Sequence, residues 1–140
     1  MNDKWTPLIN LDLISVINTQ SIKGVQVGSS EAFIFEVMGE AELPATRISK
    51  KSKIFNHLYS NVSFLSENGY VIAINIDFHG NREKMITLGG IIDWGVNDWF
   101  ELSELKGWNL NNQGNVIRII GVGIIIELSK EGELSMVSFR

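Results

Sequence analysis

The 140-residue chain contains no cysteine, which excludes a disulfide framework and any metal site built from thiolates. Histidine is nearly absent as well, because only His57 and His79 occur. Two isolated histidines without a repeated spacing do not make a metal site. We therefore expect neither a bound metal nor a cofactor.

Long hydrophobic runs are also missing. The longest strongly apolar stretch, residues 119–126, is far too short to span a bilayer. Residues 1–20 lack the basic start and the uninterrupted apolar run of a signal peptide. These features predict a soluble cytoplasmic protein without a membrane partner.

Positive charge is in short supply, since 12 Lys and Arg residues stand against 16 Asp and Glu residues, for a net charge of −4. A nucleic-acid binder needs a basic footprint that releases counterions, so nucleic acid is not an expected partner. One basic cluster exists, and its pattern is typical of a solvated loop that leads into a strand. It consists of Arg47, Lys50, Lys51 and Lys53.

Recognisable catalytic motifs are lacking too. The sequence contains no Gly-x-Ser-x-Gly elbow and no P-loop, and the Gly-Val-Gly string at 121–123 lacks the third glycine of a dinucleotide fingerprint. A strand end is flanked by Asp77, His79 and Glu83, which could serve acid–base chemistry. The same three residues are also typical of an ordinary polar turn. We expect the protein not to be an enzyme. The alternative, a small-molecule-binding or hydrolytic domain, requires those three side chains to converge in a pocket.

What the chain does contain is an internal repeat. Residues 65–76 align without a gap to residues 128–139, with Leu, Ser and Gly identical at 65/128, 66/129 and 69/132. Each copy predicts a strand, a tight turn and a second strand. Asn68 and Gly69 both tolerate a positive φ, which suits a two-residue hairpin turn.

A helical pattern precedes each hairpin. The first covers residues 29–39 and has a serine cap, and the second covers residues 97–107, with Asn97 or Asp98 as its cap. Both end on a glycine that can adopt a left-handed conformation. Helices of about three turns do not stand alone in water, so each must pack on the sheet. A further short helix is indicated near residues 11–17.

The sequence predicts an α+β fold, with an antiparallel sheet and short helices arranged as two tandem helix-plus-meander units. The units cover about residues 24–78 and 91–139 of a single domain, 1–140. Residues 71–78 alternate, with apolar side chains at 72, 74, 76 and 78, which predicts one buried face. Residues 79–90 read as a polar connection with at most one short edge strand.

The most distinctive segment is 91–108, which holds three of the four tryptophans among acidic residues. Residues 91–113 carry four acids and one base, so that 4 − 1 = 3 of the four net negative charges lie here. Acids and indoles crowded together suit a surface that grips a basic partner. The candidate partner-binding residues are Asp93, Trp94, Asp98, Glu101 and Glu104.

Helical spacing within the segment separates core from surface. Three apolar residues recur at i, i+3 and i+6 and are predicted to face the core: Trp99, Leu102 and Leu105. The helical acids then share the opposite face, and Trp94 lies before the helix, where we expect it to be exposed as an anchor. A folded protein also tolerates such a stripe as a plain solvated face, so both interpretations remain open.

Residues 24–40, GVQVGSSEAFIFEVMGE, carry a family resemblance. A glycine-containing strand end and a small-residue cap open a short helix that closes on a glycine. This is similar to the opening of small outer-membrane-assembly lipoproteins and of beta-lactamase inhibitor proteins, and it implies tandem helix-plus-sheet units. Residues 40–42 stand where those families place a proline, and the lipobox cysteine of the lipoproteins is absent.

The whole layout resembles the small acidic immunity proteins of bacterial polymorphic toxin systems, including contact-dependent growth inhibition. The likeness rests on the leader before residue 24, the helix, the strand pair ending in VIAINIDF, the Trp/Asp segment and the final hairpin. It implies a protein that neutralises a cognate toxin domain, often a basic nuclease, by covering its active site. The alternative is a non-enzymatic assembly or interaction module that binds a partner through a sheet edge.

Overall fold

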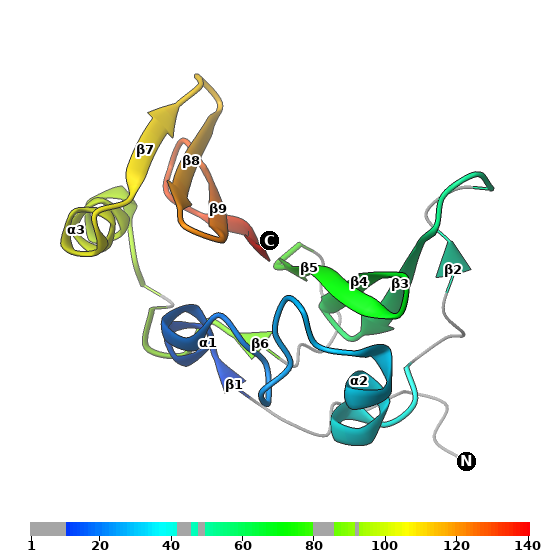
Figure 1. The fold of residues 1–140 in the computed structure, drawn as a ribbon. Coiled ribbons are helices and arrows are strands. Elements are labelled where there is room, and N and C mark those ends of the chain that lie inside the picture. The colour runs from blue at the N-terminus through cyan, green and yellow to red at the C-terminus, as the bar shows by residue number, and fades with distance from the viewer. Residues whose placement is uncertain (1–10, 42–45, 48–49, 80–85, 92) are drawn as a thin grey trace, which may run out of the picture.

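The computed structural model describes residues 11–41, 46–47, 50–79, 86–91 and 93–140, and their arrangement is drawn in Figure 1. The fold is α+β, as the sequence predicts. The elements in chain order are β1 (Leu11–Asp12), α1 (Leu13–Thr19), α2 (Glu31–Met38), β2 (Thr46–Arg47), β3 (Ile54–Tyr59), β4 (Val62–Glu67), β5 (Tyr70–Asp77), β6 (Ile86–Thr87), the 3₁₀ turn η1 (Gly89–Ile91), α3 (Val96–Lys106), β7 (Asn109–Asn112), β8 (Val116–Gly121), β9 (Ile124–Ser129) and β10 (Leu134–Phe139).

Within the described residues, eight strands form one antiparallel sheet in the order β2-β3-β4-β5-β10-β9-β8-β7. The short strand expected between residues 79 and 90 is β6, but it lies outside this sheet, because it pairs in parallel with β1. The two meanders β3-β4-β5 and β8-β9-β10 therefore meet along β5 and β10. Strands β2 and β7 lie at opposite edges of the sheet (Figure 1).

The register between β5 and β10 is symmetrical. Asn75 pairs with Ser138, and on either side of it Ile74 pairs with Phe139 and Ile76 with Val137. The offset 138 − 75 = 63 equals the offset 128 − 65 = 63 of the sequence repeat, so the equivalent residues Asn75 and Ser138 face each other on a pseudo-two-fold axis. At that axis the Ser138 hydroxyl donates a hydrogen bond to Asn75 Oδ1 at 2.8 Å. A duplication would produce this register; the duplication itself, like the single-domain assignment, stays a prediction.

Each central strand also carries one unpaired residue. In β5, Leu65 pairs with Ala73 and Ser66 with Val71, which leaves Ile72 as a bulge. A bulge reverses the alternation of faces, so Val71 is buried while Ile72 is 37% exposed. The prediction of one buried face running from residue 72 to 78 was therefore wrong at Ile72. Ser135 is the corresponding unpaired residue of β10, again 63 positions later.

The core lies between one face of the sheet and the helices. In Figure 1, α1 and α2 lie on the same side of the sheet, and both contribute to a single apolar cluster with α3. Its largest fully buried members are Trp99, Tyr59, Phe64 and Phe139. The other face carries polar pairs, including an ion pair between Arg118 and Glu127 with Nε and Oε1 2.9 Å apart.

The first unit has the serine cap and the turn that the sequence predicts, but its C-terminal glycine is not in the predicted left-handed conformation. The Ser30 hydroxyl accepts the Phe33 N–H at 3.1 Å, which caps α2. Gly39 ends the helix with φ 76° and ψ −159°, a positive φ outside the left-handed helical region. The turn at Asn68 and Gly69 has φ values of 54° and 85°, as a two-residue hairpin requires. The early helix predicted near residues 11–17 is α1.

Candidate functional site

The N-cap of helix α3 lies two or three residues before the predicted cap, Asn97 or Asp98. The N-cap is Gly95, and the Asp98 carboxylate accepts the Gly95 N–H at 2.9 Å. Neither Asn97 nor Asp98 is the cap itself, so that prediction was wrong: both lie inside the helix, and Asp98 acts as its N3 residue. The C-terminal end is as predicted, since Gly107 adopts the left-handed conformation with φ 73° and ψ 25°. Asp98 is therefore engaged in the helix start, although it is exposed.

Replacement of Asp98 by alanine should lower the free energy of unfolding by about 1 kcal/mol, because the Gly95 N–H loses its acceptor and the helix start loses a favourable charge. Chemical denaturation of the two proteins measures this difference. The control is Glu101→Ala on the same helix, which removes an exposed carboxylate that is not in the cap and should change stability by less than about 0.5 kcal/mol. Equal losses in both variants would contradict the capping role.

The buried face of α3 differs from the predicted one. Trp99 is 1% exposed and Ser103 is 4% exposed, whereas Leu105 is 82% exposed. Each residue turns a helix by about 100°, so two steps of three residues move Leu105 about 120° away from Trp99. Ser103, one step of four residues on, stays within about 40° of Trp99, and its hydroxyl donates to the Trp99 carbonyl at 2.9 Å. Leu105 was thus wrongly placed in the core, and Leu102 is only partly buried.

Trp94 is not the exposed anchor that its position suggested. It is partly buried against the apolar core, and its ring meets Trp99 edge-to-face with centroids 4.9 Å apart. Trp108 also turns inward and contacts Gly121, where a Cβ atom would overlap its indole ring. The indoles of the segment serve packing, so an anchor for a partner has to come from elsewhere.

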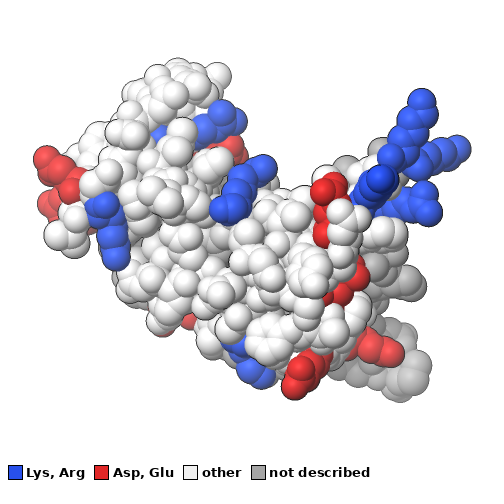
Figure 2. Space-filling view, in the orientation of Figure 1, with Lys and Arg blue, Asp and Glu red and all other residues white. Residues whose placement is uncertain are grey.

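The outward face of α3 combines acids with apolar side chains. Glu101 and Glu104 are exposed, and by helical rotation they lie between Phe100 and Leu105, which are 38% and 82% exposed. We call these four residues the α3 surface. Figure 2 shows the acidic side chains over α3 at the left of the view. Asp93 is exposed as well, just before the helix.

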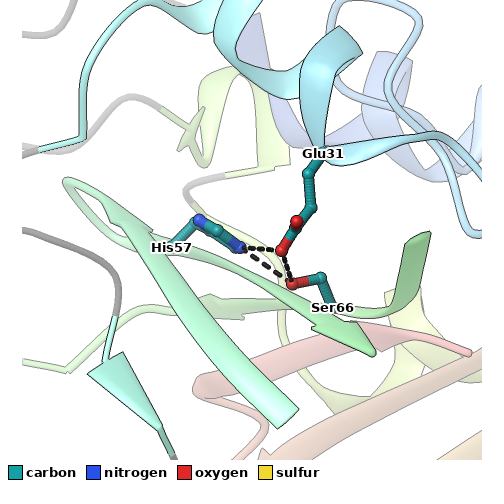
Figure 3. Close-up of polar contacts among 3 residues, drawn as sticks. All are labelled: Glu31, His57 and Ser66. Atoms are coloured by element: carbon teal, nitrogen blue, oxygen red, sulfur yellow. Dashed lines mark hydrogen bonds and ion pairs between the residues drawn. The ribbon is translucent and has the colours of Figure 1, made fainter. Parts of the chain in front are cut away.

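A second polar group, which the sequence did not reveal, joins α2 to strands β3 and β4 (Figure 3). His57 Nε2 lies 2.8 Å from Ser66 Oγ and 3.1 Å from Glu31 Oε2, and the Ser66 hydroxyl donates to Glu31 at 2.5 Å. His57 and Ser66 are 2% and 0% exposed. Glu31 lies 26 and 35 residues away from them in the chain, so no local pattern could have indicated the contact.

The arrangement of this group is structural rather than nucleophilic. A serine activated by histidine needs a carboxylate on the opposite ring nitrogen, but here both oxygens contact Nε2 and the serine proton points to Glu31. His57 Nδ1 has no hydrogen-bond partner among the described residues. The buried polar atoms thus fix α2 against the sheet, and they offer no proton relay.

Asp77 and His79 come together at the end of β5. His79 Nδ1 lies 2.8 Å from Asp77 Oδ1, and both side chains are more than half exposed. They border a hollow of about 100 Å³, which is small beside the roughly 300–1,000 Å³ of ordinary ligand pockets. Glu83, the third residue of the predicted acid–base set, lies outside the described residues.

The basic residues near β2 form the opposite end of the molecule. Arg47, Lys51 and Lys53 line an open groove of about 500 Å³ together with Phe55, and the Arg47 guanidinium lies 5.9 Å from the centre of the Phe55 ring. In Figure 2 these side chains project from the upper right, away from α3. Lys51 and Lys53 are exposed in a loop that leads into β3, as the sequence predicts, whereas Arg47 is exposed but lies in β2.

Neither a metal site nor a membrane span is found in the part of the chain that the structure describes. No three His, Asp or Glu side chains gather there as ligands. None of the helices among those residues is long and apolar enough to cross a membrane.

Comparison with known proteins returned no match to a family model, a curated protein or a solved structure.

Proposed function

We propose that the protein is an immunity protein, which binds and neutralises a cognate toxin domain in the cytoplasm without catalysing a reaction. The observation that carries the proposal is the α3 surface, where two exposed glutamates lie between an exposed phenylalanine and an exposed leucine. A helix face of this kind combines steering charge with apolar contact area.

The expected mechanism is occlusion of a basic surface, such as the nucleic-acid-binding face of a nuclease. The glutamates accelerate encounter with a cationic partner, and this effect weakens as salt screens the charges. Phe100 and Leu105 supply the anchors in place of Trp94, because they are the apolar side chains that α3 leaves in solvent.

The test is capture of the toxin domain encoded beside this protein, followed by binding kinetics at several salt concentrations. Glu101→Lys combined with Glu104→Lys should slow association by about 10- to 100-fold at low salt. The matched control is Glu36→Lys with Glu40→Lys, which makes the same charge change at exposed positions in and just after α2.

Three results would reject the proposal. They are the absence of a toxin partner, an association rate that salt does not change, and equal losses in the two double variants. An inhibited toxin whose binding responds only to the α3 variant would support both the function and its surface.

The alternative, a module that binds through a sheet edge, is favoured by one observation. All four residues of β7, at one edge of the large sheet, are exposed. Binding of a partner that depends on β7 but not on the charge of α3 would favour this reading.

A further inference from the structure

Strand β7 is an edge without the usual protection against pairing. Among the described residues it pairs with β8 alone, and its four residues are exposed. The chain has no charged residue between Lys106 and Arg118 and no proline there, although edge strands are commonly blocked by charge or proline. The opposite edge, β2, has two residues and lies among basic side chains. The free edge of β7 is thus the one suited to a further strand.

The register shows which backbone groups of β7 face outward. The Gln113 N–H donates to the Val116 carbonyl at 2.9 Å, so this pair is hydrogen-bonded. Hydrogen-bonded and non-hydrogen-bonded pairs alternate along an antiparallel ladder, which makes Asn111 a bonded residue opposite Arg118. The N–H and C=O groups of Leu110 and Asn112 consequently point away from the sheet.

This edge continues directly from the α3 surface. Only Gly107 and Trp108 separate α3 from β7, and the two elements are in contact. Leu110 is 38% exposed on the strand, and Leu105 is 82% exposed on the helix. An added strand would therefore meet backbone donors and acceptors and two apolar side chains next to the glutamates of the α3 surface (Figures 1 and 2).

We propose that β7 accepts an extended, lysine- or arginine-rich segment of the partner as an additional antiparallel strand. The inference rests on the proposed function and names the part of the partner that docks. Main-chain hydrogen bonds to Leu110 and Asn112 provide affinity, and the acids of α3 select positive charge.

The experiment uses the full chain and a synthetic peptide in which lysine and valine alternate over about eight residues, the length of an ordinary strand. Binding should slow amide hydrogen exchange at Leu110 and Asn112 by at least about tenfold, because hydrogen-bonded amides exchange only on opening. The same peptide with glutamate in place of lysine should give no protection.

A matched pair of variants isolates the backbone contact. Asn112→Pro removes the outward N–H at a position where an edge strand tolerates proline, and Asn112→Ala removes the same side chain but keeps that N–H. Both lose the hydrogen bond from the Gly114 N–H to Asn112 Oδ1. Affinity for the peptide should fall about tenfold in the proline variant relative to the alanine variant. If the proline variant does not fold, the hydrogen-exchange measurement on the unsubstituted chain still tests the inference.

Absence of peptide binding, equal affinity of the two variants, or protection located elsewhere would overturn the inference. Protection of Leu110 and Asn112 that grows with protein concentration alone would also overturn it, since a second copy of the chain would then occupy the edge. A captured toxin that binds the proline variant normally would refute this docking mode and leave the proposed function intact. If the peptide docks as described but no toxin partner is found, the docking mode is supported and the proposed function is rejected.

Discussion

Replacement of Trp99 by alanine should lower the free energy of unfolding by about 3–5 kcal/mol, the range found when a large buried aromatic side chain is removed. Trp99 is 1% exposed, and it belongs to the apolar cluster that joins the helices to the sheet. The alanine variant leaves a cavity and also strips Trp94 of its edge-to-face neighbour. Chemical denaturation, followed by circular dichroism, measures the loss.

The control is Phe100→Ala, one residue further along the same helix. Its ring is 38% exposed, so truncation should cost about 1 kcal/mol or less. If the Trp99→Ala protein does not fold, Trp99→Phe provides a milder step and should still lose more stability than Phe100→Ala. A Trp99 variant as stable as the Phe100 variant would mean that α3 is not held by this contact, and the α3 surface would lose its rigid support.

The same helix shows what spacing in a sequence can and cannot determine. Trp99 was placed correctly, since it is 1% exposed. Leu105 was placed wrongly, since an i, i+3, i+6 series rotates away from that face by about 60° at each step. Ser103 occupies the buried position instead. Its side chain is polar, so a hydrophobic pattern does not predict its burial, and its hydroxyl donates a hydrogen bond to the Trp99 carbonyl.

The sheet was predictable in its strands but not in its faces. Alternation and the Asn68-Gly69 turn located the first hairpin, because a two-residue turn with positive φ is encoded locally. The bulge at Ile72 has no such local signature, as it depends on the pairing with Ser66 on the neighbouring strand. The pairing of β5 with β10 across 63 residues likewise emerges only when the two meanders meet.

The candidate site was predicted in part. Glu101 and Glu104 are exposed on α3, whereas Asp98 is engaged in the helix start and Trp94 packs against Trp99. The exposed apolar residues of the α3 surface, Phe100 and Leu105, escaped prediction for a physical reason. A hydrophobic residue in a helix is assigned to the core by default. Only the packed structure shows that Trp99 and Ser103 occupy the buried face of α3.

The hairpin turns offer a test of how the helices are held to the two meanders. Gly69 and Gly132 occupy equivalent positions, and both have positive φ, at 85° and 88°. A Cβ atom at Gly132 would lie 2.6 Å from the Val96 backbone nitrogen, whereas a Cβ atom at Gly69 would meet nothing within 4 Å. The start of α3 therefore rests directly on the second turn, and the first turn has free space at the same point.

Gly132→Ala should consequently lower the free energy of unfolding by about 3 kcal/mol, from about 1 kcal/mol of left-handed backbone strain and about 2 kcal/mol of overpacking against α3. Gly69→Ala carries only the strain and should lose about 1 kcal/mol. Denaturation of both variants measures the difference, which reports on the contact with α3 because the two glycines have nearly the same φ. Losses of equal size would show that α3 can move away from the turn at no cost. In that case the α3 surface would not be held in one position relative to β7, and a partner could not use the two as a single preformed site.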